Sequence, residues 1–337
     1  MIHLEAERPI FVMGCPRSGT TMLQLMLHRH ARIAIPPENR FVLPGYLRRR
    51  HFGDLRREAN RERLASWIVD RPGSKFTDLK LDAEQIRAAI VAHGTDLGAA
   101  FAIVLRAYAA RFGKPRWGDK RPAYLSNVDM IRRLFPTAQL VTVLRDGRDC
   151  CASLKEMPWQ TRKDIASLAA QWAYAVDCGR RAARILPPDS YHELRYEDLV
   201  ADPEGTLRTL CAYLGEEFDP AMTRPAEIAA EAVPTAKTWH GRTHEPVGRG
   251  RAGSWRTRLT PEEISLCEAV LRDRLVAAGY EPSGAPPPTL RQRARYAVMD
   301  SANKVRVVRQ AVRGLGDLVT PDRSSPRREP SDRSGTR

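Results

Sequence analysis

The sequence predicts an α/β fold in which helices flank a central parallel sheet. Two apolar runs carry this prediction. Residues 10–13 form a short apolar run, long enough for a strand that is buried on both faces. Residues 139–144 (QLVTVL) are mostly β-branched or apolar and suit a second central strand. A chain of 337 residues is long enough for one large domain of this class with an inserted helical cap.

A glycine loop follows the first predicted strand. It runs from Gly14 to Thr21, and Gly14 and Gly19 have the spacing of a Walker phosphate loop. A helix should start at about Thr20, because apolar residues then recur at helical spacing, at Met22, Leu23, Met26 and Leu27. Strand, loop and helix N-terminus together direct unpaired backbone N–H groups and the helix dipole at one place, which indicates an anion site.

The cations of this loop depart from the Walker pattern. Where nucleoside triphosphatases have Lys followed by Ser or Thr, this chain has Thr20 and Thr21, and Arg17 lies inside the loop. This arrangement favours anion binding without the Mg-triphosphate geometry of kinases and GTPases. The alternative for this segment alone is an ordinary glycine turn between a strand and a helix.

A second candidate anion site follows the strand at 139–144. The strand runs into Arg145, and Ser153 follows eight residues later. A guanidinium at a strand end and a hydroxyl at a helix start can bind one phosphate together. Considered alone, this segment is equally well explained as an exposed charge cluster in a βα turn.

Together, the two motifs resemble those of the sulfotransferases that use 3′-phosphoadenosine 5′-phosphosulfate (PAPS). In that family a strand precedes Pro-(Lys/Arg)-Ser-Gly-Thr-Thr, as at residues 16–21 here. The resemblance implies a P-loop-like nucleotide-binding fold whose loop holds the 5′-phosphosulfate, with Arg17 at the bridging oxygen. It implies further donors from the rest of the loop: Ser18, Gly19, Thr20 and Thr21. It also implies that Arg145 and Ser153 bind the 3′-phosphate, the serine from the first turn of a helix.

Two later segments resemble other signatures of the same family. Residues 248–256 look like the C-terminal glycine loop that adds contacts to the 3′-phosphate, which makes Arg249 and Gly250 cofactor candidates. Gly248 replaces an arginine of the family pattern there, so one phosphate contact is in question. Residues 191–199 resemble the family strand ending in Arg-Tyr-Glu-Asp-Leu, whose tyrosine lies near the adenine. Tyr196 is therefore a cofactor candidate, and a packed core tyrosine is the alternative.

The resemblance also predicts which residue takes the acceptor proton. Many cytosolic sulfotransferases use a histidine shortly after a lysine, but Pro122 occupies that place after Lys120. Residues 36–40 (PPENR) instead resemble the Glu-x-Arg segment of tyrosylprotein sulfotransferases and many bacterial relatives, in which the glutamate is the base. Glu38 is accordingly the predicted base, and Lys120 is a second cation that stabilises the sulfonate.

Both assignments have alternatives. Glu38 could be a surface carboxylate paired with Arg40, and Lys120 could be a solvated lysine. Only 8 of the 55 basic residues are lysines, however, which makes an incidental lysine in this segment less expected. If Glu38 is not the base, the next candidates are His240 and His244.

Composition narrows the classes of function that remain for this chain. The net charge of +15 suits a polyanionic cofactor, and nucleic-acid binding is disfavoured because no basic segment has interleaved aromatics in a recognised nucleic-acid motif. The 6 cysteines show neither zinc spacing nor a disulfide framework, and no metal is implied. No run approaches a membrane span, and no signal-peptide core is evident, so a cytoplasmic protein is expected. The bias toward Arg and Ala favours a bacterial source.

We expect three regions along the chain. Residues 1–281 form the sulfotransferase domain, in which residues 48–116 are a mainly helical cap on the acceptor side. Residues 282–319 are a basic tail with a helix at 290–315, which could lie on an anionic membrane, on the core or on a second subunit of a homodimer. Residues 320–337 should be disordered.

The predicted function is transfer of a sulfuryl group from PAPS to a hydroxyl by in-line displacement. A small metabolite, a glycolipid, a carbohydrate or a peptide could each supply that hydroxyl. The alternatives are a P-loop kinase, disfavoured by the missing Gly-Lys-Ser/Thr, and a non-catalytic basic protein that binds nucleotides or membranes.

Overall fold

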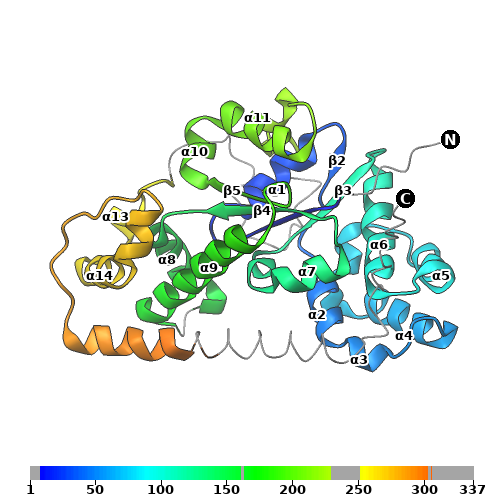
Figure 1. Ribbon diagram of the computed structural model, residues 1–337, viewed down its shortest axis with the longest axis horizontal. Coiled ribbons are helices and arrows are strands. Elements are labelled where there is room, and N and C mark those ends of the chain that lie inside the picture. The colour runs from blue at the N-terminus through cyan, green and yellow to red at the C-terminus, as the bar shows by residue number, and fades with distance from the viewer. Residues whose placement is uncertain (1–7, 161–162, 229–250, 303–304, 306–337) are drawn as a thin grey trace, which may run out of the picture.

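A computed structural model describes residues 8–160, 163–228, 251–302 and 305 of the chain. Five parallel strands form the central sheet, in the order β2-β3-β1-β4-β5 (Figure 1). Their bounds are β1 Ile10–Gly14, β2 Ile33–Ala34, β3 Arg116–Lys120, β4 Gln139–Leu144 and β5 Tyr191–Arg195. The central parallel sheet predicted from the two apolar runs is confirmed.

The strand order brings distant loops to one edge of the sheet. β1 lies in the middle and pairs with β4 on one side, where Gly14 is opposite Val143, and with β3 on the other, where Val12 is opposite Lys120. The chain moves from β1 to the β2–β3 side and then crosses to β4. In such sheets ligands bind beyond the carboxyl ends of the strands, at the point where the order reverses. Here that point lies between the loops after β1 and β4.

Helices cover both faces of the sheet because the strands bury alternate side chains on each face. Ile10 and Val12 of β1 pack with the helices of one face, and Phe11 and Met13 pack on the other. The first face carries α1 (Thr20–Arg29), α10 (Tyr196–Ala201) and α11 (Pro203–Leu214). The opposite face carries α7 (Val128–Leu134), α8 (Gly147–Lys155) and α9 (Ile165–Ile185), as Figure 1 shows.

Two helical groups extend the domain at its ends (Figure 1). One comprises α2 (Val42–Leu47), α3 (Arg49–Phe52), α4 (Glu58–Val69), α5 (Ala83–His93) and α6 (Leu97–Arg111). The other comprises α13 (Trp255–Arg258), α14 (Pro261–Ala277) and a helix at residues 290–302. Short 3-10 turns occur at η1 (Pro72–Ser74), η2 (Phe76–Leu79), η3 (Pro122–Asn127), η4 (Pro158–Gln160) and η5 (Pro220–Thr223).

Several sequence predictions fall outside the described residues. These are Arg249, Gly250, His240, His244 and the tail at 320–337. The predicted helix at 290–315 is helical over residues 290–302 and at Val305, and its other residues are not described. Within the described parts of the chain, none of the helices combines the length and apolar character needed to cross a bilayer.

Candidate active site

The glycine loop after β1 leads directly into α1, which begins at Thr20 as the spacing predicts. Gly19 is the N-cap residue, with a φ of 105°, and no side chain caps the helix, so the first-turn N–H groups remain available to an anion. Glycine is required here for a second reason. A Cβ at this position would lie 2.5 Å from Cδ2 of Tyr196, so the loop and the start of α10 approach too closely for any side chain.

Arg17 connects this loop to the loop after β4. Its Nε donates a 3.0 Å hydrogen bond to Oγ of Ser153, and its carbonyl oxygen accepts a 3.1 Å hydrogen bond from Arg145. Burial and the nearby charges of Arg145 and Arg251 lower the pKa of Arg17. Three cations are therefore held close together in a partly desolvated place, an arrangement that an anionic ligand would stabilise.

The position of Ser153 within its helix differs from the prediction. We expected it in the first turn, but α8 begins at Gly147, so Ser153 lies in the second turn. The reason is that Asp146 caps the helix one residue after Arg145, with its side chain accepting a hydrogen bond from the Arg148 N–H. Ser153 nevertheless faces the loop after β1, as its contact with Arg17 shows.

Arg145 is held from several sides and is only 5% exposed. Its guanidinium lies 4.2 Å from the ring centre of Tyr196, and its Nη2 donates a 2.6 Å hydrogen bond to the carbonyl oxygen of Arg251. Burial opposes its charged form, but Cys150, Tyr196, Asp149 and Glu197 together raise the pKa of Arg145. Tyr196 is a packed tyrosine, 7% exposed, and it lies beside the loop at Gly19. Its place near the adenine stays a prediction.

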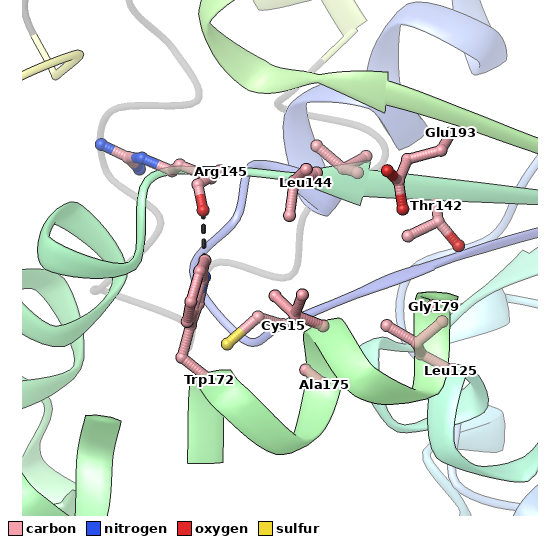
Figure 2. Close-up of a pocket in the computed structure, with 11 residues that line it drawn as sticks. Cys15, Leu125, Thr142, Leu144, Arg145, Trp172, Ala175, Gly179 and Glu193 are labelled. Carbon is pink, nitrogen blue, oxygen red and sulfur yellow. Dashed lines mark hydrogen bonds between the residues drawn. The ribbon is translucent and has the colours of Figure 1, made fainter. Parts of the chain in front are cut away.

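The backbone of Arg145 is fixed by α9. Nε1 of Trp172 donates a 3.0 Å hydrogen bond to the Arg145 carbonyl oxygen (Figure 2). A small cavity lies alongside, lined by residues of β4 and α9 and by Cys15, and the Arg145 side chain points away from it in Figure 2. Its interior of about 10 Å³ has room for about one water molecule. It is too small for a nucleotide.

Asp149 is a site residue that the sequence analysis missed. Its carboxylate, 0% exposed, accepts hydrogen bonds from the backbone of Gly253 (2.8 Å) and Trp255 (2.8 Å) and from the hydroxyl of Ser254 (3.1 Å). It therefore holds the second half of the predicted glycine loop, residues 253–255, against α8. Its Oδ2 also lies 3.7 Å from Nη2 of Arg145. The only sequence signal was its position in the charged run after β4.

Glu38 and Lys120 meet beside the loop although they are 82 residues apart. Lys120 is the last residue of β3 and is 3% exposed. Its Nζ lies 3.5 Å from Oε2 of Glu38 and 3.3 Å from Oγ1 of Thr21. Burial lowers the pKa of Lys120, and the carboxylates of Glu38 and Asp119 oppose that shift. The lysine therefore bridges the predicted base and the anion loop.

Two neighbours support this pair, and neither was singled out in the sequence. Nε of Arg121 lies 4.0 Å from Oε1 of Glu38, so the carboxylate lies between two cations. Asp119 is fully buried; it accepts a 2.8 Å hydrogen bond from the Lys120 N–H and another from the Tyr124 hydroxyl. Burial raises the pKa of Asp119 to about 6, although the contacts with Tyr124, Asn39 and Lys120 oppose the rise. Asp119 thus fixes the end of β3 where Lys120 enters the site.

A model of the sulfotransferase family matches residues 9–220, which include both loops, Glu38, Lys120 and Tyr196. The chain belongs to this family. The sulfotransferase is 26% identical to protein-tyrosine sulfotransferase 1 of Danio rerio over 299 residues, which cover 82% of this chain and 74% of the relative. It is 26% identical to the nodulation protein NoeE of Sinorhizobium fredii, over 81% of this chain and 66% of the relative. For protein-tyrosine sulfotransferase of Drosophila melanogaster the identity is 25%, and the match covers 52% of the relative.

Solved structures confirm the fold of this sulfotransferase. The sulfotransferase domain from the curacin biosynthetic pathway superposes with a TM-score of 0.59 at 20% identity, over 82% of this chain and 98% of that domain. The sulfotransferase domain of the Synechococcus PCC 7002 olefin synthase gives a TM-score of 0.56 at 24% identity, over 81% and 96%. The P-loop-like fold with a parallel sheet is therefore as predicted.

The enzyme is a PAPS-dependent sulfotransferase that acts on a hydroxyl acceptor, and the kinase and non-catalytic alternatives are not favoured. The unpartnered polar atoms of the site show whether its residues fit PAPS as the donor. Among the described residues, the buried Oγ of Ser18 and Nε of Arg145 have no hydrogen-bond partner. One lies in the loop at the start of α1 and the other at the end of β4, where phosphate oxygens would satisfy them. The residues present therefore fit this donor.

Proposed function

We propose that Glu38 is the base of this sulfotransferase and that Arg17 and Lys120 are its fixed cations. The observation that carries the proposal is the chain of contacts from Glu38 through Lys120 Nζ to Thr21 in the anion loop. A base is useful only within reach of the reacting atoms. Here Lys120 contacts both the Glu38 carboxylate and Thr21 of the loop that would hold the phosphosulfate. This contact lies beyond the C-terminal ends of the strands.

We assign the donor contacts by the same reasoning. PAPS would supply the sulfuryl group, and the negative charge that develops would leave with its 3′,5′-adenosine bisphosphate part. Ser18, Gly19, Thr20 and Thr21 would bind the 5′-phosphosulfate through hydroxyls and helix N–H groups. Arg145 and Ser153 would bind the 3′-phosphate, and Tyr196 would lie near the adenine. The unpartnered buried atoms of Ser18 and Arg145 support these assignments.

Three side chains would have different roles in the transfer. Glu38 would take the proton of the acceptor hydroxyl as the acceptor oxygen forms a bond to sulfur. The bond between sulfur and the 5′-phosphate oxygen would break at the same time, and 3′,5′-adenosine bisphosphate would leave. Lys120 holds the Glu38 carboxylate in place and supplies positive charge on the acceptor side of the loop. Arg17 supplies positive charge on the opposite side, next to Ser153. Catalysis would rest on positioning and on charges that are already in place before the reaction.

A tyrosine of a peptide is the first acceptor to test, because two of the three relatives described above are named protein-tyrosine sulfotransferases. Its phenol is also the most acidic of the common hydroxyl acceptors, which suits a carboxylate base. Glycans, glycolipids and small alcohols form the comparison panel.

The proposal is tested by incubating the full chain with PAPS and each acceptor class, and by following two products. We expect 3′,5′-adenosine bisphosphate to be released together with an acceptor that has gained one sulfuryl group by mass spectrometry. ATP should not replace PAPS. Nucleotide binding without a sulfated product across the whole panel, by protein whose fold is intact, would contradict a catalytic role.

A further inference from the structure

The helix at residues 290–302 is attached to the domain by one of its faces. Thr289 and Gln292 cap its start reciprocally, through hydrogen bonds of 2.8 Å and 3.3 Å between side chain and backbone. Tyr296 is 9% exposed and packs with residues of α8, α9 and α14. Nε of Arg295 lies 2.8 Å from Oδ2 of Asp164, the residue that caps α9. The helix runs along the edge of this group in Figure 1.

The other face of this helix presents apolar side chains to solvent. Leu290 is 85% exposed, Val298 is 59% exposed and Val305 is 50% exposed. Seven large apolar residues are exposed in the described part of the chain, and these three lie within 16 consecutive residues. Their spacing of eight and seven residues puts them on one side of a helix. The exposed apolar side chains therefore form a stripe rather than scattered single positions.

Basic residues accompany this apolar stripe along the sequence. Arg291 and Arg293 are exposed next to Leu290. Over residues 290–315 the sequence has seven Lys or Arg and a single Asp, and the apolar spacing continues with Val308, Val312 and Leu315. An apolar stripe with basic flanks is the pattern of helices that lie in the interface of a membrane.

We propose that the helix at residues 290–302, together with Val305, docks the enzyme on the surface of an anionic phospholipid bilayer. Leu290, Val298 and Val305 enter the headgroup region, and the flanking arginines lie near the lipid phosphates. A second copy of the chain is a poorer occupant, because it would bring two strongly basic faces together. Tyr296 holds the opposite face and Arg295 pairs with Asp164 beside it, so docking fixes the orientation of the whole domain relative to the membrane.

The test is sedimentation of the full chain with vesicles of phosphatidylcholine and phosphatidylserine, or of phosphatidylcholine alone. Wild type should sediment with the anionic vesicles at low salt and less at high salt. The double variant Leu290→Ser/Val298→Ser should bind at least about tenfold more weakly, because it removes the apolar contacts. Arg291→Gln/Arg293→Gln should lose roughly fivefold per charge.

Two control variants test whether vesicle binding depends on this helix rather than on any exposed apolar or basic residue. Ile185→Ser changes an apolar residue of similar exposure (53%) at the end of α9, and Arg184→Gln removes a neighbouring exposed charge. Both should bind vesicles like wild type. Point variants are preferable to deletion of the helix, since deletion would uncover the surface that Tyr296 covers. Thermal midpoint and sulfotransferase activity on a soluble acceptor should not change in any variant.

Three results would overturn the proposal. The first is a wild type that does not sediment with anionic vesicles at low salt. The second is equal binding by wild type and Leu290→Ser/Val298→Ser. The third is a dimer in sedimentation velocity that this double variant abolishes, which would assign the stripe to a second copy of the chain.

Discussion

Nε of Arg17 donates a 3.0 Å hydrogen bond to Oγ of Ser153, across 136 residues of sequence. This bond joins the loop after β1 to the helix after β4, the two places to which the 5′ and 3′ phosphates of the donor are assigned. Arg145 reinforces the junction through the Arg17 carbonyl oxygen, at 3.1 Å. The two proposed phosphate sites are therefore joined by these hydrogen bonds, and a change in one should affect the other.

The 3′-phosphate assignment predicts that 3′,5′-adenosine bisphosphate binds far better than AMP. Losing a charged hydrogen-bond partner costs roughly 1.5–3 kcal/mol, so Arg145→Ala should weaken binding of the bisphosphate by about tenfold or more and weaken binding of AMP by less than that. Titration calorimetry of both nucleotides measures this difference. Ser153→Ala should show a smaller loss in the same direction. Equal affinity of the wild type for the two nucleotides would remove the site.

The assignment of Glu38 as base predicts a loss of chemistry without a loss of binding. Glu38→Gln keeps the shape of the side chain, so affinity for 3′,5′-adenosine bisphosphate should be retained while turnover falls by roughly 10²–10⁴-fold. Single-turnover rates with saturating donor separate the chemical step from product release.

Arg17→Ala serves as the contrasting variant for that experiment. Because Arg17 faces an anion before and during transfer, its loss should weaken donor binding as well as turnover. If Glu38→Gln keeps near wild-type turnover when chemistry is rate-limiting, the base lies elsewhere. His240 and His244 would then be the next residues to change.

The close approach of Gly19 and Tyr196 predicts a strong effect of a single methyl group. Gly19→Ala combines a φ of 105° with a contact of 2.5 Å to the Tyr196 ring, and should lower the free energy of unfolding by about 2–4 kcal/mol. Gly113→Ala is the matched control, since Gly113 also has a positive φ (64°) but nothing within 4 Å of its Cβ position.

Urea unfolding of the two variants separates backbone strain from the clash. Gly113→Ala should lose only the strain, about 1–2 kcal/mol. Combining Gly19→Ala with Tyr196→Ala should recover part of the difference, because the clash is then absent. Similar losses for Gly19→Ala and Gly113→Ala would show that Tyr196 can move aside without cost.

The buried carboxyl of Asp119 predicts a pH dependence of stability. Its pKa rises from 3.8 to about 6 on folding, so the folded state binds this proton more tightly than the unfolded state. Below pH 3.8 the group is neutral in both states. As pH rises from there to about 6, the free energy of unfolding falls, on the order of 3 kcal/mol in all. Above about pH 6 the decrease in the free energy of unfolding is complete and no longer changes with pH.

Asp119→Asn should not show this decrease. The difference in unfolding free energy between the variant and wild type should therefore shift in favour of the variant as pH rises from about 4 to about 6. Tyr124→Phe provides a second check. Its hydroxyl lowers the pKa of Asp119, so its removal should move the wild-type transition to higher pH. A difference between Asp119→Asn and wild type that does not change with pH would contradict the prediction.

Local pattern was sufficient to predict much of the molecule. The strand at Gln139–Leu144 and the helix start at Thr20 appear where predicted, because β-branched runs and apolar spacing act over a few neighbouring residues. The anion loop could be found for the same reason: two glycines at a fixed spacing determine its backbone. The turn of α8 that carries Ser153 was misjudged, since it depends on the capping of Asp146.

Only the tertiary structure decided what surrounds these motifs. Nothing near Lys120 in sequence shows that it ends a strand beside β1, which brings its Nζ to Glu38 and Thr21. Likewise, the sequence shows Asp149 only as one of several charged residues after β4. The structure shows that it accepts hydrogen bonds from Gly253 and Trp255, which are 104 and 106 residues away. The physical reason is the crossover order of a parallel sheet: it places the ends of distant strands at one edge, and side-chain contacts there depend on neighbours that no local pattern encodes.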